Sequence, residues 1–418
     1  MRGGRAFGRA AGWTLMMGLG GALSAATWTV SPEGPHSGLK AVLSAAAPHD
    51  SIRVLAGTYA EGTVTIDRPL TLLGVGGPVI DGGAQGHVLV ITAPQVTVQG
   101  LVITGTLVSN LQDNAGIHVD GVDDVRIVDN ELRNCFFAVH LSNVRRALIS
   151  GNRILGDPAT PETRRANGIH LWRCTDAVVQ GNLADHHRDG IYFEFVTGSR
   201  IEGNTCRGNL RYGLHFMFSH RDDYADNEFV DNGAGVAVMF SHSIRMTGNR
   251  FLHNRGGSAY GLLLKEINDS ELRGNTFTDN TTGLMVDGCN RVHAEGNTFR
   301  SNGWALRLFS NATGCTIAGN SFIGNTFDVS TNGDLMLNTL AANYWDRHLG
   351  YDLDRDGHGD VPYRPVGFFA LLVERIPYAI IFSRSLFVTL LDQAERVIPS
   401  LSPAALKDDR PLMRPPHG

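Results

Sequence analysis

The chain contains little of what many catalytic and nucleic-acid sites require. Its only lysines are Lys40, Lys265 and Lys407, which leaves little material for a lysine-based catalytic site. The net charge is -5, so no basic footprint points to nucleic acid as a partner. The five cysteines include no Cys-x-x-Cys pair, and we interpret them as small buried apolar side chains. Beyond residue 26 no uninterrupted apolar run reaches about 18 residues, so we expect no membrane-spanning helix.

Residues 1–26 have the three-part layout of a secretory signal peptide. Arg2, Arg5 and Arg9 precede an apolar run over residues 10–23, and residues 22–26 are mostly small. We therefore expect the protein to mature outside the cytoplasm. A disordered cytoplasmic leader is the alternative interpretation.

Two series of marker residues share one period from Gly116 onward. A Gly or Ala followed by alternating apolar residues recurs at intervals of 22, 30, 22, 23, 22, 26, 22 and 22 residues, and an Asn marks the turn that follows each one. Two series with one period indicate a solenoid. The first series is Gly116, Ala138, Gly168, Gly190, Gly213, Gly235, Gly261, Gly283 and Ala305. The second is Asn130, Asn152, Asn182, Asn204, Asn227, Asn249, Asn275, Asn297 and Asn320.

The strand pattern within each repeat identifies the type of solenoid. Each unit holds short apolar alternations and no helical pattern, so we predict an all-β fold, a right-handed parallel β-helix of roughly a dozen coils. Asn tolerates a left-handed backbone at the corner, and stacked Asn side chains can hydrogen-bond along the column. An aromatic residue two positions after the Asn should form an interior stack. Its members are Phe229, Phe251, Phe277, Phe299 and Phe322.

The domain organisation follows from where this pattern begins and ends. We expect an N-terminal cap over residues 27–51 with a short helix over residues 39–47, the β-helix over 52–342, an Asp-rich loop over 343–366 and a C-terminal segment over 367–418. The longer intervals of 30 and 26 residues predict loops around residues 157–165 and 256–259. Such insertions usually project on one face of a solenoid and often serve binding.

The sequence Met-Phe-Ser-His occurs twice, exactly one repeat apart. Met217 should therefore lie beside Met239, and His220 beside His242, on strands about 4.8 Å apart. Two thioethers and two imidazoles form a soft ligand set that suits monovalent copper. We predict a copper site at these four residues, assisted by His215. The alternative is plain repeat duplication, with each Met packed against an aromatic neighbour.

Histidines are concentrated in one outward column that includes His215. The residue two positions after each Gly or Ala should face outward, because the apolar residues beside it face the core. Four of the first five positions in this column are His, more than the composition of 16 His in the chain predicts. The column is His118, His140, His170, Tyr192, His215, Ala237, Leu263, Met285 and Arg307.

A second candidate metal site lies beyond the repeats. Asp352, Asp354, Asp356 and Asp360 have the DxDxDGxGD spacing of calcium loops, in which alternating carboxylates converge on a hard cation. The twelfth position is Tyr363 instead of the usual Glu. A structural calcium ion and an ion-free turn rich in hydrogen bonds both remain open.

The C-terminal segment is apolar and compatible with helix over residues 368–397, with a break at Pro377. It is too polar to cross a membrane and too apolar to stand alone in water. We expect it to cap the solenoid, dock on another protein, or do both. A Pro-rich tail that follows should be extended.

Several of these motifs resemble those of one known family. YGLHFMFSH, GAGVAVMFSHS, NYWD-x₄-GYD-x-D-x-DG-x-GD-x-PYRP and the ending ERVIPSLSP-x₉-RPLMRP are similar to sequences of the periplasmic copper-maturation protein NosD, over roughly residues 116–415. The resemblance implies a non-catalytic periplasmic subunit, held at the inner membrane by the membrane subunit of an ABC transporter with a cytoplasmic ATPase subunit. It implies that monovalent copper is taken from a lipoprotein chaperone and passed to nitrous oxide reductase.

The competing hypotheses are a β-helix polysaccharide lyase, epimerase or hydrolase acting on extracytoplasmic carbohydrate, and a purely structural or adhesive β-helix. An enzyme of this kind needs clustered or paired carboxylates. The acidic candidates near consecutive turns are Asp185, Asp189, Glu194, Asp222 and Asp223.

Overall fold

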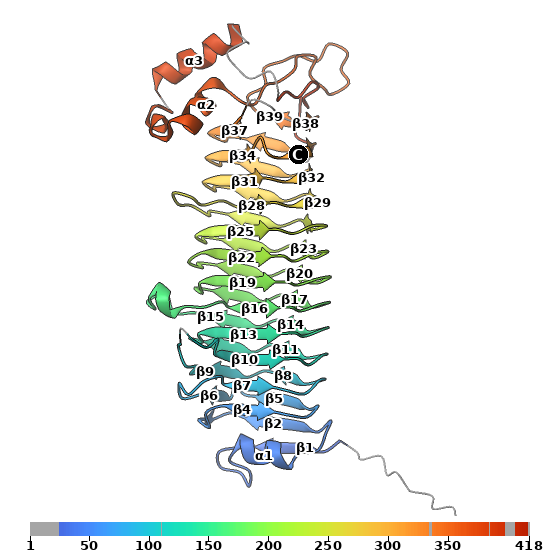
Figure 1. Cartoon of the computed structure of the whole chain (residues 1–418), viewed down its shortest axis with the longest axis vertical. Helices are drawn as coiled ribbons and strands as arrows, with labels where there is room; N and C mark the ends of the chain where they lie inside the picture. Colours follow the sequence, from blue (N-terminus) through green and yellow to red (C-terminus); the bar gives the residue numbers. More distant parts are fainter. Residues whose placement is uncertain (1–24, 110, 334–336, 384, 398–405, 417–418) are drawn as a thin grey trace, which may run out of the picture.

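The protein is a parallel β-helix closed at each end by non-repeating chain (Figure 1). The computed structural model describes residues 25–109, 111–333, 337–383, 385–397 and 406–416. The predicted signal peptide therefore lies outside the described residues, apart from its last two. Three strands per coil build three sheets, which we name A, B and C, of 14, 13 and 12 strands. The predicted fold class is confirmed.

Short strands, most of them three to six residues long, make up each sheet. Sheet A contains β1 Thr27–Val30, β2 Ser51–Leu55, β5 Thr71–Val75, β8 Thr97–Gln99, β11 Arg126–Val128, β14 Leu148–Ser150, β17 Val178–Gln180, β20 Arg200–Glu202, β23 Asp223–Ala225, β26 Arg245–Thr247, β29 Asn268–Arg273, β32 Asn290–Glu295, β35 Thr313–Ala318 and β38 Leu337–Ala341. Sheet B contains β3 Thr58–Tyr59, β6 Val79–Asp81, β9 Val102–Thr104, β12 Glu131–Arg133, β15 Arg153–Leu155, β18 Leu183–Asp185, β21 Thr205–Arg207, β24 Glu228–Val230, β27 Arg250–Leu252, β30 Thr276–Thr278, β33 Thr298–Arg300, β36 Ser321–Ile323 and β39 Tyr344–Trp345. Sheet C contains β4 Val64–Ile66, β7 Leu89–Ile91, β10 Ala115–Asp120, β13 Phe137–Ser142, β16 Ile169–Trp172, β19 Asp189–Glu194, β22 Tyr212–Met217, β25 Ala234–Met239, β28 Leu262–Lys265, β31 Thr282–Asp287, β34 Trp304–Leu308 and β37 Phe327–Ser330.

The predicted Asn column is a continuous hydrogen-bonded ladder inside the corner between sheets A and B. Each side-chain amide donates to the next Asn Oδ1 at 2.9–3.1 Å, from Asn130 to Asn343. The predicted reason for Asn was wrong, however. The left-handed residue is the one before the Asn, such as Asp129 (φ 52°) or Gly203 (φ 61°). Asn is needed because its side chain satisfies buried backbone groups on neighbouring coils.

A second Asn ladder, not predicted, runs inside the corner between sheets B and C. It links Asn209 to Asn325 at 2.9–3.3 Å. The predicted Phe stack is confirmed beside it: ring centroids from Phe229 to Phe322 lie 4.6–5.4 Å apart, and Trp345 closes the stack at 4.1 Å. All five cysteines are free and buried, as predicted.

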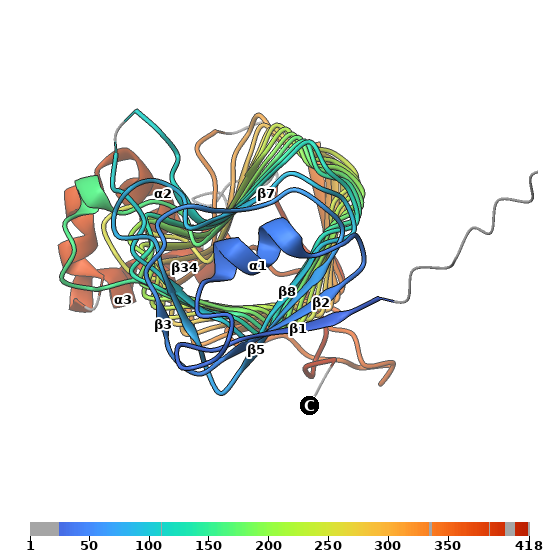
Figure 2. The ribbon, with the colours of Figure 1, turned by 90° about the horizontal axis from the view of Figure 1, so that it is seen from below.

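The N-terminal end is covered by the helix α1 (Leu39–Ala45), which lies across the opening of the first coil (Figure 2). Leu39, Val42 and Leu43 of α1 are buried in the core. The open edge of the last coils is covered by the C-terminal segment, which forms α2 (Phe368–Arg375), the 3₁₀ helix η2 (Pro377–Phe382) and α3 (Leu386–Val397). In the described part of the chain, no helix has both the length and the apolar character needed to cross a bilayer.

The end of the chain returns to the last coil. Asp408 is fully buried and accepts hydrogen bonds from the Asn343 backbone N–H at 2.8 Å and from the Trp345 indole at 3.1 Å. These two residues are the ends of the Asn ladder and the aromatic stack. The Pro-rich tail was expected to be extended, but residues 406–416 form bends with isolated bridges, from Asp408 to Leu340 and from Leu412 to Tyr344, and so lie against the last coil.

Candidate metal sites

Loops project from one corner of the solenoid, where sheet B passes into sheet C. They are residues 105–114 between β9 and β10, residues 156–168 with η1 (Glu162–Arg164) between β15 and β16, and residues 253–261 between β27 and β28. The last two are the predicted insertions. The longer loops stand on the same side of the solenoid as α2 and α3 (Figure 2). They border the outer face of sheet C, which carries the predicted His and Met columns.

The predicted outward column of histidines exists in register. His118 pairs with His140, His140 with His170, His170 with Tyr192, and Tyr192 with His215. Centroids of consecutive rings lie 4.8–5.2 Å apart. The column was expected to face outward, but two of its four histidines are buried: His140 and His215 are only 9% and 7% exposed. Neighbouring aromatic rings, Phe137 and Tyr212 among them, cover their faces.

The buried column holds its imidazoles neutral. Burial lowers the pKa of His170 to about 3 and that of His215 to about 4, with nearby positive charges adding to the effect. Buried ring nitrogens without a hydrogen-bond partner occur on His118, His140, His170 and His215. A neutral ring with a free lone pair is the form that binds a metal ion.

The two Met-Phe-Ser-His segments lie side by side as predicted. Met217 pairs with Met239 at the ends of β22 and β25, and both side chains are half-buried. The rings of His220 and His242 stack at 4.1 Å with 13° between their planes. Burial is the main cause that lowers the pKa of His220, followed by the charge of His242.

A corner separates the methionine pair from the histidine pair. Phe218 and Phe240 occupy it in left-handed conformations, with φ of 50° and 53°, and their rings stack at 5.2 Å. The methionines therefore belong to sheet C, and the histidines begin the turn into sheet A. His215 lies on the same strand as Met217, and Tyr192 Oη lies 3.9 Å from Met217 Sδ. We name Met217, Met239, His220 and His242 the Met/His patch.

The predicted calcium loop gathers three of its four carboxylates. Ligand oxygens of Asp352, Asp354 and Asp356 all lie within 4.8 Å of one another. Asp360 does not join this group: its Oδ2 accepts the Leu353 backbone N–H at 2.8 Å. Asp356 is also paired with Arg410, and Asp352 accepts the Gly357 N–H at 2.9 Å. Part of the negative charge of the loop is therefore balanced by groups of the same chain, even without a metal ion.

The carboxylates considered for a carbohydrate enzyme do not form a catalytic pair. Asp222 points into the coil and is fully buried, while its neighbour Asp223 is paired outside with Arg245 at 2.6 Å. Asp185 is paired with Arg207 at 2.8 Å in sheet B. Glu194 lies on another face, beside Met217 on sheet C. Asp189 is buried near Arg188 at the start of β19.

Comparison with known proteins gives relatives over most of the chain. Residues 156–351 match the family model described as "Periplasmic copper-binding protein (NosD)". A protein of Pseudomonas aeruginosa named "Probable ABC transporter binding protein NosD" is 34% identical over 86% of this chain and 87% of its own length. A protein of the same name from Stutzerimonas stutzeri is 30% identical over 87% of each.

Among solved structures, a family 28 exopolygalacturonase from Yersinia enterocolitica has a TM-score of 0.58. The match covers 76% of this chain and 78% of that one, at 11% identity, so it shows the fold alone.

Fold and surface together define a parallel β-helix protein with thioether and imidazole donors on its outer face. With relatives of this identity and coverage, the chain belongs to the NosD family of periplasmic copper-binding proteins.

Proposed function

We propose that this chain binds monovalent copper at the Met/His patch, with assistance from His215. The observation that supports this most directly is the pairing of identical donors from consecutive coils: Met217 beside Met239, and His220 stacked on His242 at 4.1 Å. Thioether sulfur and neutral imidazole are ligands that favour monovalent copper over hard cations.

Copper at this patch would be held for transfer and not locked in a closed site. The two imidazoles are nearly parallel, so their in-plane lone pairs run side by side and do not converge on one point. One ring must turn before both can bind the same ion. Met217 and Met239 are only half-buried, which suits an ion that is received from one protein and passed to another.

The transfer route follows from the family. Relatives are named as ABC transporter binding proteins, and we propose the same partner here: the membrane subunit of an ABC transporter with a cytoplasmic ATPase subunit. In this proposal a lipoprotein chaperone supplies the copper, nitrous oxide reductase receives it during maturation, and the chain itself performs no catalysis.

The C-terminal helices supply a docking surface for the transporter. On one side, Phe369, Ala370 and Val373 of α2 pack against Trp304 and Phe327 of the last coils. In the described part of this segment, nine large apolar side chains are at least 37% exposed: Phe368, Ile376, Tyr378, Ile380, Ile381, Phe382, Leu386, Phe387 and Leu390. Such a concentration on one short segment marks an interaction surface. We propose that it holds the chain at the inner membrane through the transporter.

The Asp352 loop is assigned a lesser role. Three gathered carboxylates suit a calcium ion that would stiffen the turn next to the returning C-terminal tail. We propose this ion as structural, outside the path of copper.

The test is anaerobic titration of the purified chain with monovalent copper against a competing chelator. We expect the double variant Met217→Ala/Met239→Ala to lose at least about tenfold in affinity, as for loss of metal ligands. Met285→Ala is the matched control, because Met285 is a half-buried methionine on the same face of sheet C but away from the patch. Equal affinity of all three proteins would disprove the assignment of the patch.

A further inference from the structure

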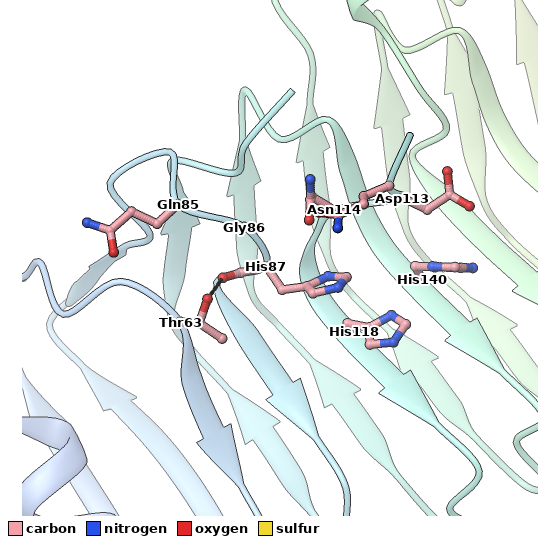
Figure 3. A pocket seen from close by; sticks show the side chains of 9 residues that line it. Thr63, Gln85, Gly86, His87, Asp113, Asn114, His118 and His140 are labelled. Carbon is pink, nitrogen blue, oxygen red and sulfur yellow. Dashed lines mark hydrogen bonds between the residues drawn. The ribbon is translucent and has the colours of Figure 1, made fainter. Parts of the chain in front are cut away.

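A separate cavity of about 490 Å³ lies toward the N-terminal end of sheet C (Figure 3). Its walls include His87, Asp113, Asn114, His118 and His140. Asp113 and Asn114 belong to the loop 105–114, which projects over the start of β10. The cavity is four coils away from Met239, and it lacks methionine.

Three imidazoles gather on one side of this cavity. The rings of His87 and His118 are stacked with centroids 4.3 Å apart, and those of His118 and His140 lie 5.2 Å apart. Figure 3 shows the Asp113 side chain above His140.

Two buried ring nitrogens in the cavity wall have no hydrogen-bond partner. Nδ1 of His118 and Nδ1 of His140 are buried without a partner. Nδ1 of His87, in contrast, accepts the Ala115 backbone N–H at 3.0 Å, so this nitrogen is occupied. Buried polar atoms without a partner are uncommon and call for an explanation.

We propose that this cavity binds a divalent transition-metal ion, with His118 and His140 as nitrogen ligands, Asp113 as carboxylate ligand and His87 as the ring that packs against His118. Imidazole with carboxylate is a harder donor set than the Met/His patch and suits divalent zinc, cobalt or copper more than monovalent copper. The ring nitrogens do not yet converge, so binding includes a rotation of the tilted His118 and His140 rings.

This proposal does not depend on the copper function of the Met/His patch. The two sites share no residue, and their donor sets select different oxidation states. Failure of one assignment therefore leaves the other intact, and the two are tested with different ions.

The experiment is titration of the purified full chain, prepared without a histidine tag, with divalent cobalt followed by displacement with zinc. We expect one equivalent of cobalt to bind with visible absorption typical of nitrogen and oxygen ligands. The double variant His118→Ala/His140→Ala should weaken this binding by at least about tenfold. Met217→Ala/Met239→Ala should bind cobalt as the unaltered chain does.

The matched control is His253→Ala/His293→Ala, which removes two exposed imidazoles elsewhere on the coils. It should leave the tight cobalt site unchanged. Because His140 is largely buried, circular dichroism and thermal melting must show that the His118/His140 variant is folded. If it is not, Asp113→Asn tests the same site, since Asp113 is exposed and its substitution keeps the shape. Absence of cobalt binding in the unaltered chain, or unchanged binding in the folded site variants, would overturn the proposal.

Discussion

The interior and the outer face of the same coils differ in how strictly the residue type repeats from one coil to the next. Inside, one residue type repeats from coil to coil: Asn with Asn from residue 130 to 343, and Phe with Phe from residue 229 to 322. Outside, on the same sheets, the residue type changes along the column, from His at 118 to Met at 285 and Arg at 307. The interior is constrained by stacking, because each ladder hydrogen bond requires the same group one coil away.

The outer face of sheet C has no such constraint, and its residue types change in order along the solenoid. The column carries imidazoles between β10 and β22, β22 and β25 carry the paired methionines, and Arg307 pairs with Glu374 of α2 at the C-terminal end. The repeat thus gives every coil the same backbone, while the side chains on the outer face give successive regions of the solenoid different binding properties. Three predictions test this division, in addition to the two metal titrations.

The largest effect is expected from the interior. Phe277 is fully buried and stacked between Phe251 at 4.6 Å and Phe299 at 4.7 Å. Phe277→Ala should destabilise the protein by about 3–5 kcal/mol, the usual result of deleting a buried ring. Met285→Ala, one strand later on the outside, should destabilise it by less than about 1 kcal/mol. Urea denaturation midpoints measure both. Equal losses would mean that the two faces do not differ in this way.

A smaller effect on stability, which depends on pH, is expected at the end of the series of Gly and Ala residues that runs from Gly116 to Ala305, one in each coil. Asp328 takes that position in the last coil, and burial raises its pKa to about 6, opposed by Arg347 and assisted by Asp346. Its Oδ2 accepts a hydrogen bond from the Tyr363 hydroxyl at 3.2 Å. Because the pKa is raised on folding, this carboxyl stabilises the fold fully below about pH 4, and that stability is lost as the pH rises through 6.

Asp328→Asn should therefore be more stable relative to the unaltered chain at pH 8 than at pH 4, by roughly 3 kcal/mol. Asp269→Asn is the outer counterpart. Asp269 is paired with Arg291 at 2.6 Å, which lowers its pKa, so its contribution has the opposite sign and disappears on acidification. Thermal melting from about pH 2 to pH 8 measures both variants, because the contribution of Asp269 is lost only below the ordinary carboxyl pKa of about 4. A parallel pH profile for the two would refute this difference between an inner and an outer carboxylate.

The smallest effect concerns association. Ile381 and Leu386 are 80% and 75% exposed on the C-terminal segment. The variant Ile381→Glu/Leu386→Glu should weaken co-purification with the transporter membrane subunit by about tenfold, or about 1.4 kcal/mol, because charge is placed on an apolar contact surface. Leu111→Glu, at a residue 94% exposed near the other end of the solenoid, should leave the association unchanged. The reverse result would assign docking to the N-terminal coils.

The fold could be predicted in detail because it is periodic. One interval of 22 residues set which residues stack, and the register of Met217 with Met239 followed from counting along the sequence. The break at Pro377 also followed from local chemistry, since η2 begins there. The second Asn ladder has the same period, but in most of its coils the residue before the Asn is not Gly, so the pattern is weaker in the sequence.

The histidine cavity could not be predicted in this way. His87 lies three positions before the column residue Val90, so it stands outside the outward column and counting along that column does not reach it. Asp113 lies in a loop whose path is not repeated in any other coil. Their meeting beside His118 depends on how that loop folds over sheet C. Burial of His140 and His215 depends on rings from neighbouring strands, which no residue count reveals.

The sequence by itself determined the solenoid, its inner ladders and the pairing of like residues on its outer face, because stacking coils of equal length places each residue beside its counterpart. Only the tertiary structure decided where the chain turns and which distant segments meet. It made a corner between the methionine and histidine pairs, returned Asp408 to the end of the Asn ladder and brought Asp113 to the cavity beside three imidazoles. These features depend on insertions and ends of the chain, where the repeat no longer fixes position and contacts between distant segments do.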